Sequence, residues 1–338
     1  MKKITCIGYH ETGSSAIDDF FKEFDNCASG PSDYEARLLQ DPDGISDLEY
    51  NLVDNPHRLN SGFALKRFRI FCQRNRRTYE GIFGKRWLEE VEKFIDSLIK
   101  VKYKGYWIAD LMLLNPIIFA AYKFRRGMRK VLPKDWRRQK DYNYLPNIDF
   151  YHTCLTEKEF IEKVQVFVER LCELLSPNGK EFLLLDQFLP TTNIQRYLRY
   201  INDIKVIIAD RDPRDVYVQI LKDHVMPKDP VQYCIAYKDY RKTRDEEAKD
   251  IEHVLVVQFE DLIYKYDEMM EKVVKFVGED WKHHIMPKAH FNPQVSKKNI
   301  QQWKGRQDLA YAITIIEHEL PEYLYSSPFV LAKGSIEG

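Results

Sequence analysis

Short apolar runs mark the strands that the sequence predicts. Residues 3–7 and 205–210 are each followed by a turn and then by a helical pattern, and residues 181–185 are mostly apolar along their length. A strand that is apolar on both faces is typical of a parallel sheet covered by helices on both sides. The alternation of strands and helices therefore predicts an α/β fold, with a mainly parallel sheet and flanking helices.

The strand signals fade between about residues 26 and 178. Residues 86–99 and 160–175 carry apolar side chains at helical spacing. We therefore expect one domain whose middle part is a large helical insertion, or acceptor subdomain. The expected ranges are 1–338 for the single domain, 1–25 and 179–310 for its core, about 26–178 for the insertion, and 308–338 for a C-terminal helix and tail.

The turn after the first predicted strand has residue types suited to a phosphate group. Residues 8–15 read Gly-Tyr-His-Glu-Thr-Gly-Ser-Ser, which is the spacing of a P-loop with Ser14 where a nucleoside triphosphatase carries Lys. Backbone N–H groups and the hydroxyls of Thr12, Ser14 and Ser15 would bind an anion there without a magnesium ion. An ordinary strand-to-helix turn with Ser/Thr capping remains the alternative.

A second turn of this kind follows the strand at residues 205–210. Residues 211–215 read Arg-Asp-Pro-Arg-Asp, and Pro213 suits the first turn of a helix. The alternative is a surface charge cluster that caps a helix. Because ligands of open α/β sheets bind at the carboxyl ends of strands, we expect both turns to form one site.

The two turns resemble the 5′- and 3′-phosphate-binding segments of sulfotransferases, which use 3′-phosphoadenosine-5′-phosphosulfate (PAPS) as donor. The resemblance covers residues 3–25 and 181–306 and implies a P-loop-like sulfotransferase architecture, with PAPS as cofactor and no metal. The further segments that match, in the family's order, are residues 253–262 (a strand ending Y-E-D-L), 269–278 (a helix ending F-L/V-G) and 296–304 (a closing loop, S-x-x-x-I-G-x-W-K).

The resemblance also implies roles for single residues. Arg211 would contact the 3′-phosphate, Gln219 stands where the family usually has a Ser that helps, and Lys297 or Lys298 would meet the same phosphate. The nucleotide-binding residues implied in this way are Glu11, Thr12, Gly13, Ser14, Ser15, Arg211, Gln219, Lys297, Lys298 and Trp303.

Sulfuryl transfer needs a base for the acceptor proton and positive donors around the leaving oxygen. Where many cytosolic relatives have a Lys in the loop, this chain has Glu11, which has the wrong charge for that role. A protonated His10 would replace the missing cation, so His10 is a catalytic candidate. Lys222 and His224 are weaker candidates.

The base is expected in the segment that follows residues 181–185. The family's histidine and lysine positions are here Phe188 and Gln187, which leaves Asp186 as the candidate base. An Asp at a strand end is also a common helix cap, and that reading stays open.

Charge and cysteine content limit the partners and the compartment. The chain has 52 Lys and Arg against 52 Asp and Glu, so its net charge does not favour nucleic acid, and we expect none as a partner. Its six cysteines include no C-x-x-C pair, which is typical of reduced thiols in a cytoplasmic protein.

No signal peptide precedes the strand that begins at Lys3, and we expect no membrane span. We interpret residues 106–122 as a buried helix, with peripheral membrane contact as an alternative.

The sequence thus favours a PAPS-dependent sulfotransferase that acts on a carbohydrate hydroxyl in a polysaccharide or glycolipid. Basic stretches at residues 66–77 and 125–138 would suit a groove for an acidic glycan, although charge runs are more often solvated helix faces. Two alternatives stay open. One is a nucleotide- or glycan-binding protein that has lost catalysis, and the other is a P-loop kinase-like phosphotransferase.

Overall fold

The structure is a computed structural model, and its chain forms two compact units. The described residues are 1–31, 34–105, 107–110, 116–128, 130–131, 148–176, 178–223, 225–247 and 249–326. The first unit comprises Met1–Asp41, Arg76–Trp87 and Gln165–Gly338, and the second comprises Pro42–Asn75 and Leu88–Val164.

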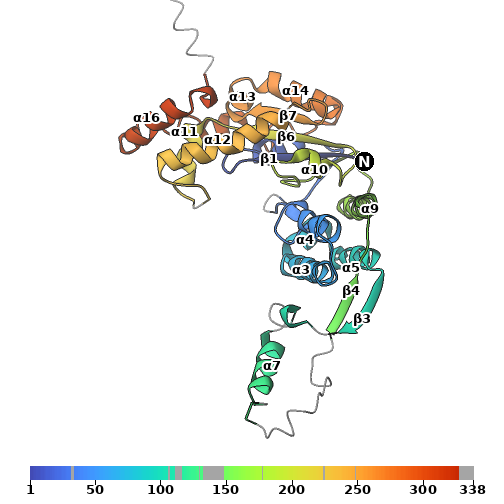
Figure 1. Ribbon diagram of the computed structural model, residues 1–338. Coiled ribbons are helices and arrows are strands. Elements are labelled where there is room, and N and C mark those ends of the chain that lie inside the picture. The colour runs from blue at the N-terminus through green and yellow to red at the C-terminus, as the bar shows by residue number, and fades with distance from the viewer. Residues whose placement is uncertain are drawn as a thin grey trace, which may run out of the picture. The chain divides into compact units, whose positions relative to one another are not determined.

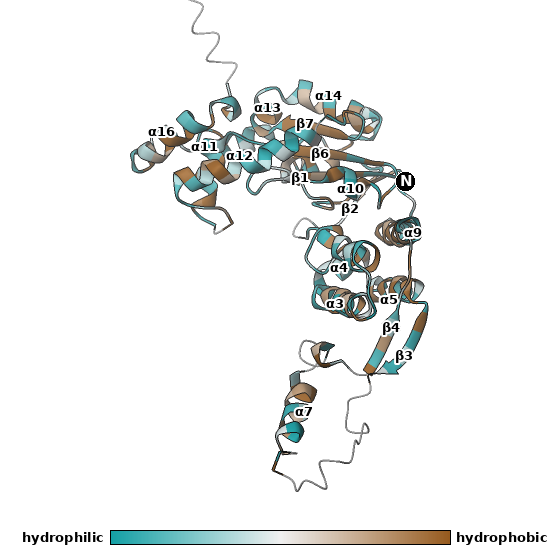
Figure 2. Ribbon diagram, viewed as in Figure 1, coloured by the Kyte–Doolittle hydropathy of each residue, from teal (hydrophilic) through white to brown (hydrophobic). Residues whose placement is uncertain are grey.

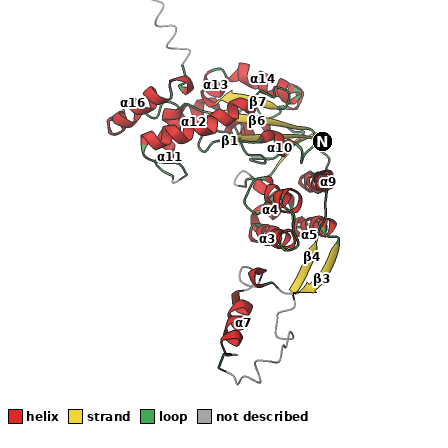
Figure 3. Ribbon diagram, in the orientation of Figure 1, coloured by secondary structure: helices red, strands yellow, loops and turns green. Residues whose placement is uncertain are grey.

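The first unit contains a five-stranded sheet in which every pair of neighbouring strands is parallel (Figures 1 and 3). The strand order is β2-β5-β1-β6-β7, so the first strand of the chain lies in the middle of the sheet. The predicted α/β fold with a mainly parallel sheet is therefore confirmed. The strands are β1 (Lys2–Gly8), β2 (Cys27–Ser29), β5 (Phe182–Leu184), β6 (Ile204–Asp210) and β7 (Val254–Gln258).

Helices α1, α13 and α14 pack on one face of this sheet. Ile4 and Cys6, two residues apart on β1, are fully buried in the same cluster as Phe20 of α1 and Met270 of α14. Figure 2 shows the hydrophobic colouring of the strands that this burial requires. The helices of the first unit are α1 (Ser15–Phe21), α4 (Arg76–Phe83), α10 (Ile194–Leu198), α11 (Pro213–Ile220), α12 (Pro230–Glu247), α13 (Phe259–Tyr264), α14 (Tyr266–Val277), α15 (Pro293–Ser296) and α16 (Ala310–Glu319), with 3-10 turns η1 (Arg37–Leu39), η4 (Trp281–His283), η5 (Lys297–Asn299), η6 (Gln307–Leu309) and η7 (Pro321–Tyr323).

The two predicted phosphate turns follow neighbouring strands. β1 and β6 pair in register from Lys3 opposite Ile204 to Gly8 opposite Ala209. After β1 the chain continues to β2 on one side of the sheet, whereas β7 lies on the other side, next to β6. Such a change of direction between adjacent parallel strands opens a crevice at their carboxyl ends, where α/β proteins bind ligands.

The second unit contains helices and a two-stranded antiparallel sheet. The sheet pairs β3 (Val101–Gly105) with β4 (Ile148–His152), and the sequence pattern did not predict it. β2 and α4 lie in the range expected for the insertion, and the structure places them in the first unit. The remaining elements are α2 (Ile45–Glu49), the π-helix η2 (Tyr50–Asp54), α3 (Asn60–Arg74), α5 (Trp87–Leu98), α7 (Pro116–Met128) and α9 (Glu157–Leu175), of which α5 and α9 extend into the first unit.

Basic side chains of the stretch 66–77 pair with carboxylates. Lys66 pairs with Asp110, Arg67 Nε lies 2.8 Å from Asp43, and Arg69 Nε lies 2.8 Å from Glu92. Much of the second basic stretch, residues 125–138, lies outside the described residues. A groove for an acidic glycan therefore stays a prediction.

The expectation of a buried helix at residues 106–122 is wrong for residues 116–122. These residues begin α7, which has no buried residue, and Ile117 is 83% exposed. Residues 106 and 111–115 lie outside the described part. Among the helices that the structure describes, none combines the length and the apolar character of a membrane span.

A buried carboxylate after α1 holds the segment that leads into the predicted closing loop. Glu23 is fully buried, and it accepts hydrogen bonds from the backbone N–H groups of Lys288, His290 and Phe291 at 2.9 to 3.0 Å. His284 Nε2 lies 2.6 Å from the same carboxylate. Residues 284–291 are thereby fixed to the end of α1.

We expect Glu23→Ala to lower the free energy of unfolding by about 3 kcal/mol, because three backbone N–H groups, of which that of Phe291 is buried, would lose their acceptor. Urea unfolding followed by circular dichroism measures this change. Glu173→Ala, at an exposed position on α9, is the matched control and should change the free energy by less than about 0.5 kcal/mol. Equal losses for the two variants would contradict the anchoring role of Glu23.

Candidate functional site

The loop between β1 and α1 has an unusual backbone conformation. His10 and Glu11 have φ angles of 59° and 54°, and Gly13 has a φ of 89°. Left-handed conformations are unfavourable for residues other than Gly and concentrate at binding and catalytic sites. The loop closes on itself through the Tyr9 N–H, which donates to Thr12 Oγ1 at 3.1 Å.

Phe259, the first residue of α13, packs against this loop at Gly13. A Cβ atom on Gly13 would lie 2.4 Å from Cδ2 of the Phe259 ring, so only Gly fits at this position. The Arg211 guanidinium lies 5.1 Å from the centre of the same ring. One aromatic ring thus positions both predicted phosphate turns.

Arg211 connects three segments that are far apart in the sequence. Its side chain is 4% exposed, its Nη1 donates to the carbonyl oxygen of Glu11 at 2.9 Å, and its Nη2 donates to the carbonyl oxygen of Asn299. Its Nε has no acceptor among the described residues. The loop after β1, the start of α11 and the closing loop therefore meet at one guanidinium, as we expected for a single site.

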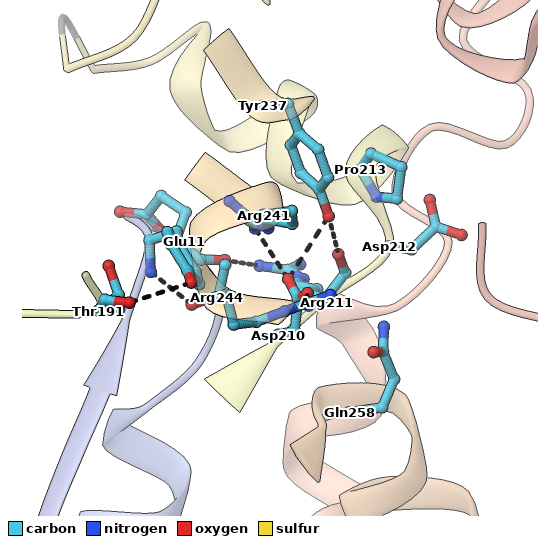
Figure 4. Close-up of polar contacts among 12 residues, drawn as sticks. Glu11, Thr191, Asp210, Arg211, Asp212, Pro213, Tyr237, Arg241, Arg244 and Gln258 are labelled. Atoms are coloured by element: carbon cyan, nitrogen blue, oxygen red, sulfur yellow. Dashed lines mark hydrogen bonds and ion pairs between the residues drawn. The ribbon is translucent and has the colours of Figure 1, made fainter. Parts of the chain in front are cut away.

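A charge cluster from α12 holds the end of β6 next to Arg211 (Figure 4). The Asp210 carboxylate accepts hydrogen bonds from Arg241 Nη2 at 2.8 Å and from Arg244 Nη1. The fully buried Arg241 guanidinium lies 3.9 Å from the ring centre of Tyr9 and 3.8 Å from that of Tyr237. Tyr9, the first residue of the loop, is thus held by stacking on a paired cation.

The predicted closing loop is bound to α11 through Asp215. The Asp215 carboxylate accepts from the N–H groups of Gln301 and Gln302 at 2.7 and 2.6 Å. The Arg214 guanidinium covers the Trp303 ring at 4.0 Å. Burial raises the pKa of Asp215 above its usual range. The loop is therefore fastened over the start of α11.

Sequence reasoning did not single out Glu260, which anchors the same turn. Its Oε1 accepts from the Asp212 N–H at 2.9 Å, and its Oε2 accepts from Gln258 Nε2 at 3.0 Å. Burial raises the pKa of Glu260 to about 7. The match of residues 253–262 to the family strand contained this glutamate, but only the folded structure shows which group it holds.

The candidate residues of the first loop differ in exposure. His10, Glu11 and Ser15 are exposed, whereas Thr12 is 2% exposed and its hydroxyl serves inside the loop. Ser14 makes no side-chain cap to α1, because its hydroxyl accepts from Gln187 Nε2 at 3.0 Å. This bond joins the loop to the segment that carries Asp186.

The remaining nucleotide-binding candidates lie on α11 and the closing loop. Lys297 and Lys298 are exposed. Gln219 Nε2 donates to Gln302 Oε1 at 2.6 Å and its Oε1 accepts from Lys222 at 2.8 Å, so both ends of its amide are engaged. One further candidate, His224, lies outside the described residues.

Asp186 follows β5 and is half-buried, while Phe188 is 1% exposed in the core. The N–H of Ala36 donates to the backbone carbonyl of Asp186 at 2.9 Å, and Gln187 has a left-handed φ of 52°. Burial raises the pKa of Asp186. Among the described residues no group of His, Cys, Asp or Glu side chains has an arrangement suited to a metal ion.

No protein-family model and no curated protein matches the chain. It is similar to solved sulfotransferase structures. The first is a sulfotransferase domain from the olefin synthase of Synechococcus PCC 7002, with a TM-score of 0.45 and 12% identity over 97% of this chain and 95% of that one. The second is sulfotransferase STF9 from Mycobacterium avium, with a TM-score of 0.38 and 12% identity over 95% of this chain and 76% of that one. The third is sulfotransferase STF1 from Mycobacterium tuberculosis, with a TM-score of 0.38 and 10% identity over 89% of this chain and 76% of that one. At such scores we rest no functional argument on these similarities.

The close approach of Gly13 to Phe259 generates a stability prediction. We expect Gly13→Ala to cost about 3 kcal/mol, because the methyl group adds a steric clash to the strain of a left-handed residue. Gly84→Ala is the matched control, since Gly84 has a similar φ of 82° with open space around it. It should cost only about 1 kcal/mol. Urea unfolding of both variants measures the difference, and equal costs would show that the contact with Phe259 is unimportant.

Proposed function

We propose that this protein is a sulfotransferase that moves the sulfuryl group of PAPS to a hydroxyl of a carbohydrate acceptor. The observation that carries this proposal is the convergence of three segments on Arg211, at the carboxyl ends of two adjacent parallel strands. These segments are the ones whose residues resemble the nucleotide-binding parts of sulfotransferases.

The Nε–H of Arg211, unpaired within the described part of the chain, supports the proposal that this residue binds the 3′-phosphate. A buried donor without an acceptor is unfavourable by about 1–3 kcal/mol, and a phosphate oxygen would remove this cost. The exposed Lys297 and Lys298 on the adjoining loop would add positive charge on the solvent side. Gln219 would contribute only after giving up one of its two present hydrogen bonds.

The loop after β1 is the proposed site of the 5′-phosphate. Its backbone N–H groups from Thr12 to Ser15 and the Ser14 and Ser15 hydroxyls supply donors at the sheet edge. Glu11 is exposed, so the surrounding water screens its carboxylate and reduces its repulsion of the phosphosulfate. A protonated His10, which is also exposed, would supply the cation that the loop otherwise lacks.

Asp186 is the proposed base. The acceptor oxygen attacks sulfur while its proton passes to the Asp186 carboxylate, and the bridging oxygen leaves with the 5′-phosphate as 3′-phosphoadenosine 5′-phosphate (PAP). The described cysteines form no disulfide. Because free thiols are typical of a reducing compartment, we propose that the reaction takes place in the cytoplasm.

A nucleotide-binding protein without catalysis is the second candidate. The absence of any Lys or Arg from the sequence of residues 8–15 favours it, because the leaving group would then depend on His10. Nucleotide binding alone does not distinguish the two candidates, so binding and transfer are tested separately.

Calorimetric titration with PAP tests the nucleotide site. We expect micromolar binding that Arg211→Ala weakens roughly 10- to 100-fold, because a charge-assisted hydrogen bond is lost. Arg170→Ala, which removes an exposed Arg from α9, is the matched control and should bind PAP as the wild type does. Tighter binding of ATP with magnesium, or no binding of PAP, would contradict the sulfotransferase proposal.

Transfer of radiolabelled sulfate from PAPS to a set of glycan acceptors tests catalysis. We expect Asp186→Asn to lower the turnover number by at least roughly 100-fold, since it removes the base, while PAP affinity stays within about twofold. If the wild type binds PAP but labels no acceptor, the result favours a nucleotide-binding protein without catalysis. If Asp186→Asn retains full turnover, another group is the base.

A further inference from the structure

A cavity of about 100 Å³ lies beside the loop after β1, within the first unit. It is bounded by α1 and by the segments that follow β5 and β2, and Ser15, Asp18, Lys22, Tyr34, Leu185 and Asp186 are among its lining residues. A space of this size holds about three water molecules, or one small polar group of a larger ligand. The proposed base Asp186 is thus part of the wall of a cavity.

Asp18 also lines this cavity, and no function has so far been assigned to it. The residue lies on α1 and is 3% exposed. No N–H or O–H donor of the described residues reaches either of its carboxylate oxygens. A buried carboxylate whose only nearby donor is the weak S–H group of Cys6 is strongly unfavourable, so Asp18 is stabilised by keeping a proton. Burial, together with the neighbouring Asp186 carboxyl, raises the pKa of Asp18 well above its usual range.

The carboxyl of Asp186 is the hydrogen-bond acceptor for that proton. Its Oδ1 likewise has no donor among the described residues, unless Asp18 is protonated. Burial raises the pKa of Asp186, and the hydrogen bond from Asp18 lowers it. Two adjacent carboxyls in one cavity therefore share a single proton, with Asp18 as the donor and Asp186 as the ionised acceptor.

The other titratable groups around the pair fit this arrangement. Burial raises the pKa of Cys6 on β1 well above its usual range and that of Cys27 on β2 to about 12, so both thiols are neutral. Lys22, the C-cap of α1, lies 2.8 Å from Asp19 and favours ionisation of both carboxyls, while Glu35 disfavours ionisation of Asp186. The ion-pair partner of Lys22 is thus Asp19, which is not one of the two carboxyls that share the proton.

We propose that Asp18 is a positioning residue for the base. It keeps its proton near neutral pH, donates it in a hydrogen bond to Asp186, and so holds Asp186 ionised and fixed in the cavity that receives the acceptor hydroxyl. This inference rests on the proposed function. In the transfer step the acceptor O–H bond breaks and its proton goes to Asp186, a bond forms between the acceptor oxygen and sulfur, and the bond from sulfur to the 5′-phosphate oxygen breaks, with its electrons leaving on PAP. Asp18 keeps its own proton throughout.

Two substitutions of Asp18 separate hydrogen bonding from charge. Asp18→Asn keeps a neutral donor of the same shape, whereas Asp18→Leu keeps the branching at Cγ but is larger and has no donor. The measurement is the titration of the Asp186 carboxyl carbon by NMR in the full-length chain labelled with ¹³C at the aspartate carboxyls. The Asp186 signal is identified by its absence in Asp186→Asn.

We expect Asp18→Asn to leave the Asp186 midpoint within about 0.3 pH units of the wild type, because the hydrogen bond that stabilises the ionised form is kept. Asp18→Leu removes that bond, so the midpoint should rise by about one pH unit or more. Since the base must be ionised, the acidic limb of kcat/KM should move upward by the same amount in Asp18→Leu and stay in place in Asp18→Asn.

Each outcome decides the proposal. A midpoint that falls in Asp18→Asn would mean that Asp18 is ionised in the wild type, and would overturn the proposal even if Asp18→Leu does not fold. An unchanged midpoint in a folded Asp18→Leu would overturn it as well. PAP titration of the same variants should give wild-type affinity. A failure of PAP binding in the wild type would instead reject the sulfotransferase proposal, while the NMR titration still tests the pair.

Discussion

The hydrogen bonds of the Arg211 guanidinium to two backbone carbonyls are the constraint on which the candidate site depends. Glu11 and Asn299 lie 200 and 88 positions from Arg211 in the sequence, and both direct a carbonyl oxygen to it. Carbonyls hold an arginine without neutralising it, so its positive charge remains available to an anion. The geometry of the proposed nucleotide site is therefore set by the fold, and binding need not pay the full entropy of ordering these segments.

Buried carboxylates around Arg211 keep it in place without pairing with it through their side chains. Asp210 is matched by Arg241 and Arg244, while Asp215 and Glu260 accept from backbone N–H groups. Each of these acids is satisfied by another donor, which leaves the guanidinium charge of Arg211 without a carboxylate partner among these contacts. Removing one member of such a buried network is strongly destabilising, because its partners are left unpaired. The network therefore keeps the arrangement rigid.

The sequence predicted the sheet and the position of the turns that follow β1 and β6, because apolar strands and parallel connectivity follow local patterns. It did not predict the partners of Asp215, because a bond from a side chain to a distant backbone N–H depends on tertiary structure alone. Asp18 shows a second limit. It flanks the apolar stripe of Ile17, Phe20 and Phe21 on α1, and at a stripe's edge the sequence does not say whether a residue faces water or the interior. The pairing of β3 with β4 was missed although Val101 and Tyr103 alternate with lysines, a pattern typical of an edge strand.

Two acidic residues near the proposed reaction site, Glu11 and Asp18, have opposite consequences, because their surroundings differ. Glu11 stands where a cation is expected, yet it is exposed, and water and salt reduce its influence on a bound anion. Asp18 is buried, where a second negative charge beside Asp186 would be costly, so protonation is the cheaper state. A neutral Asp18 then becomes a hydrogen-bond donor, which a basic carboxylate in a cavity requires in order to stay ionised. A loop without a cation and a buried second carboxyl beside Asp186 are thus compatible with the proposed transfer chemistry, provided that the proton stays on Asp18.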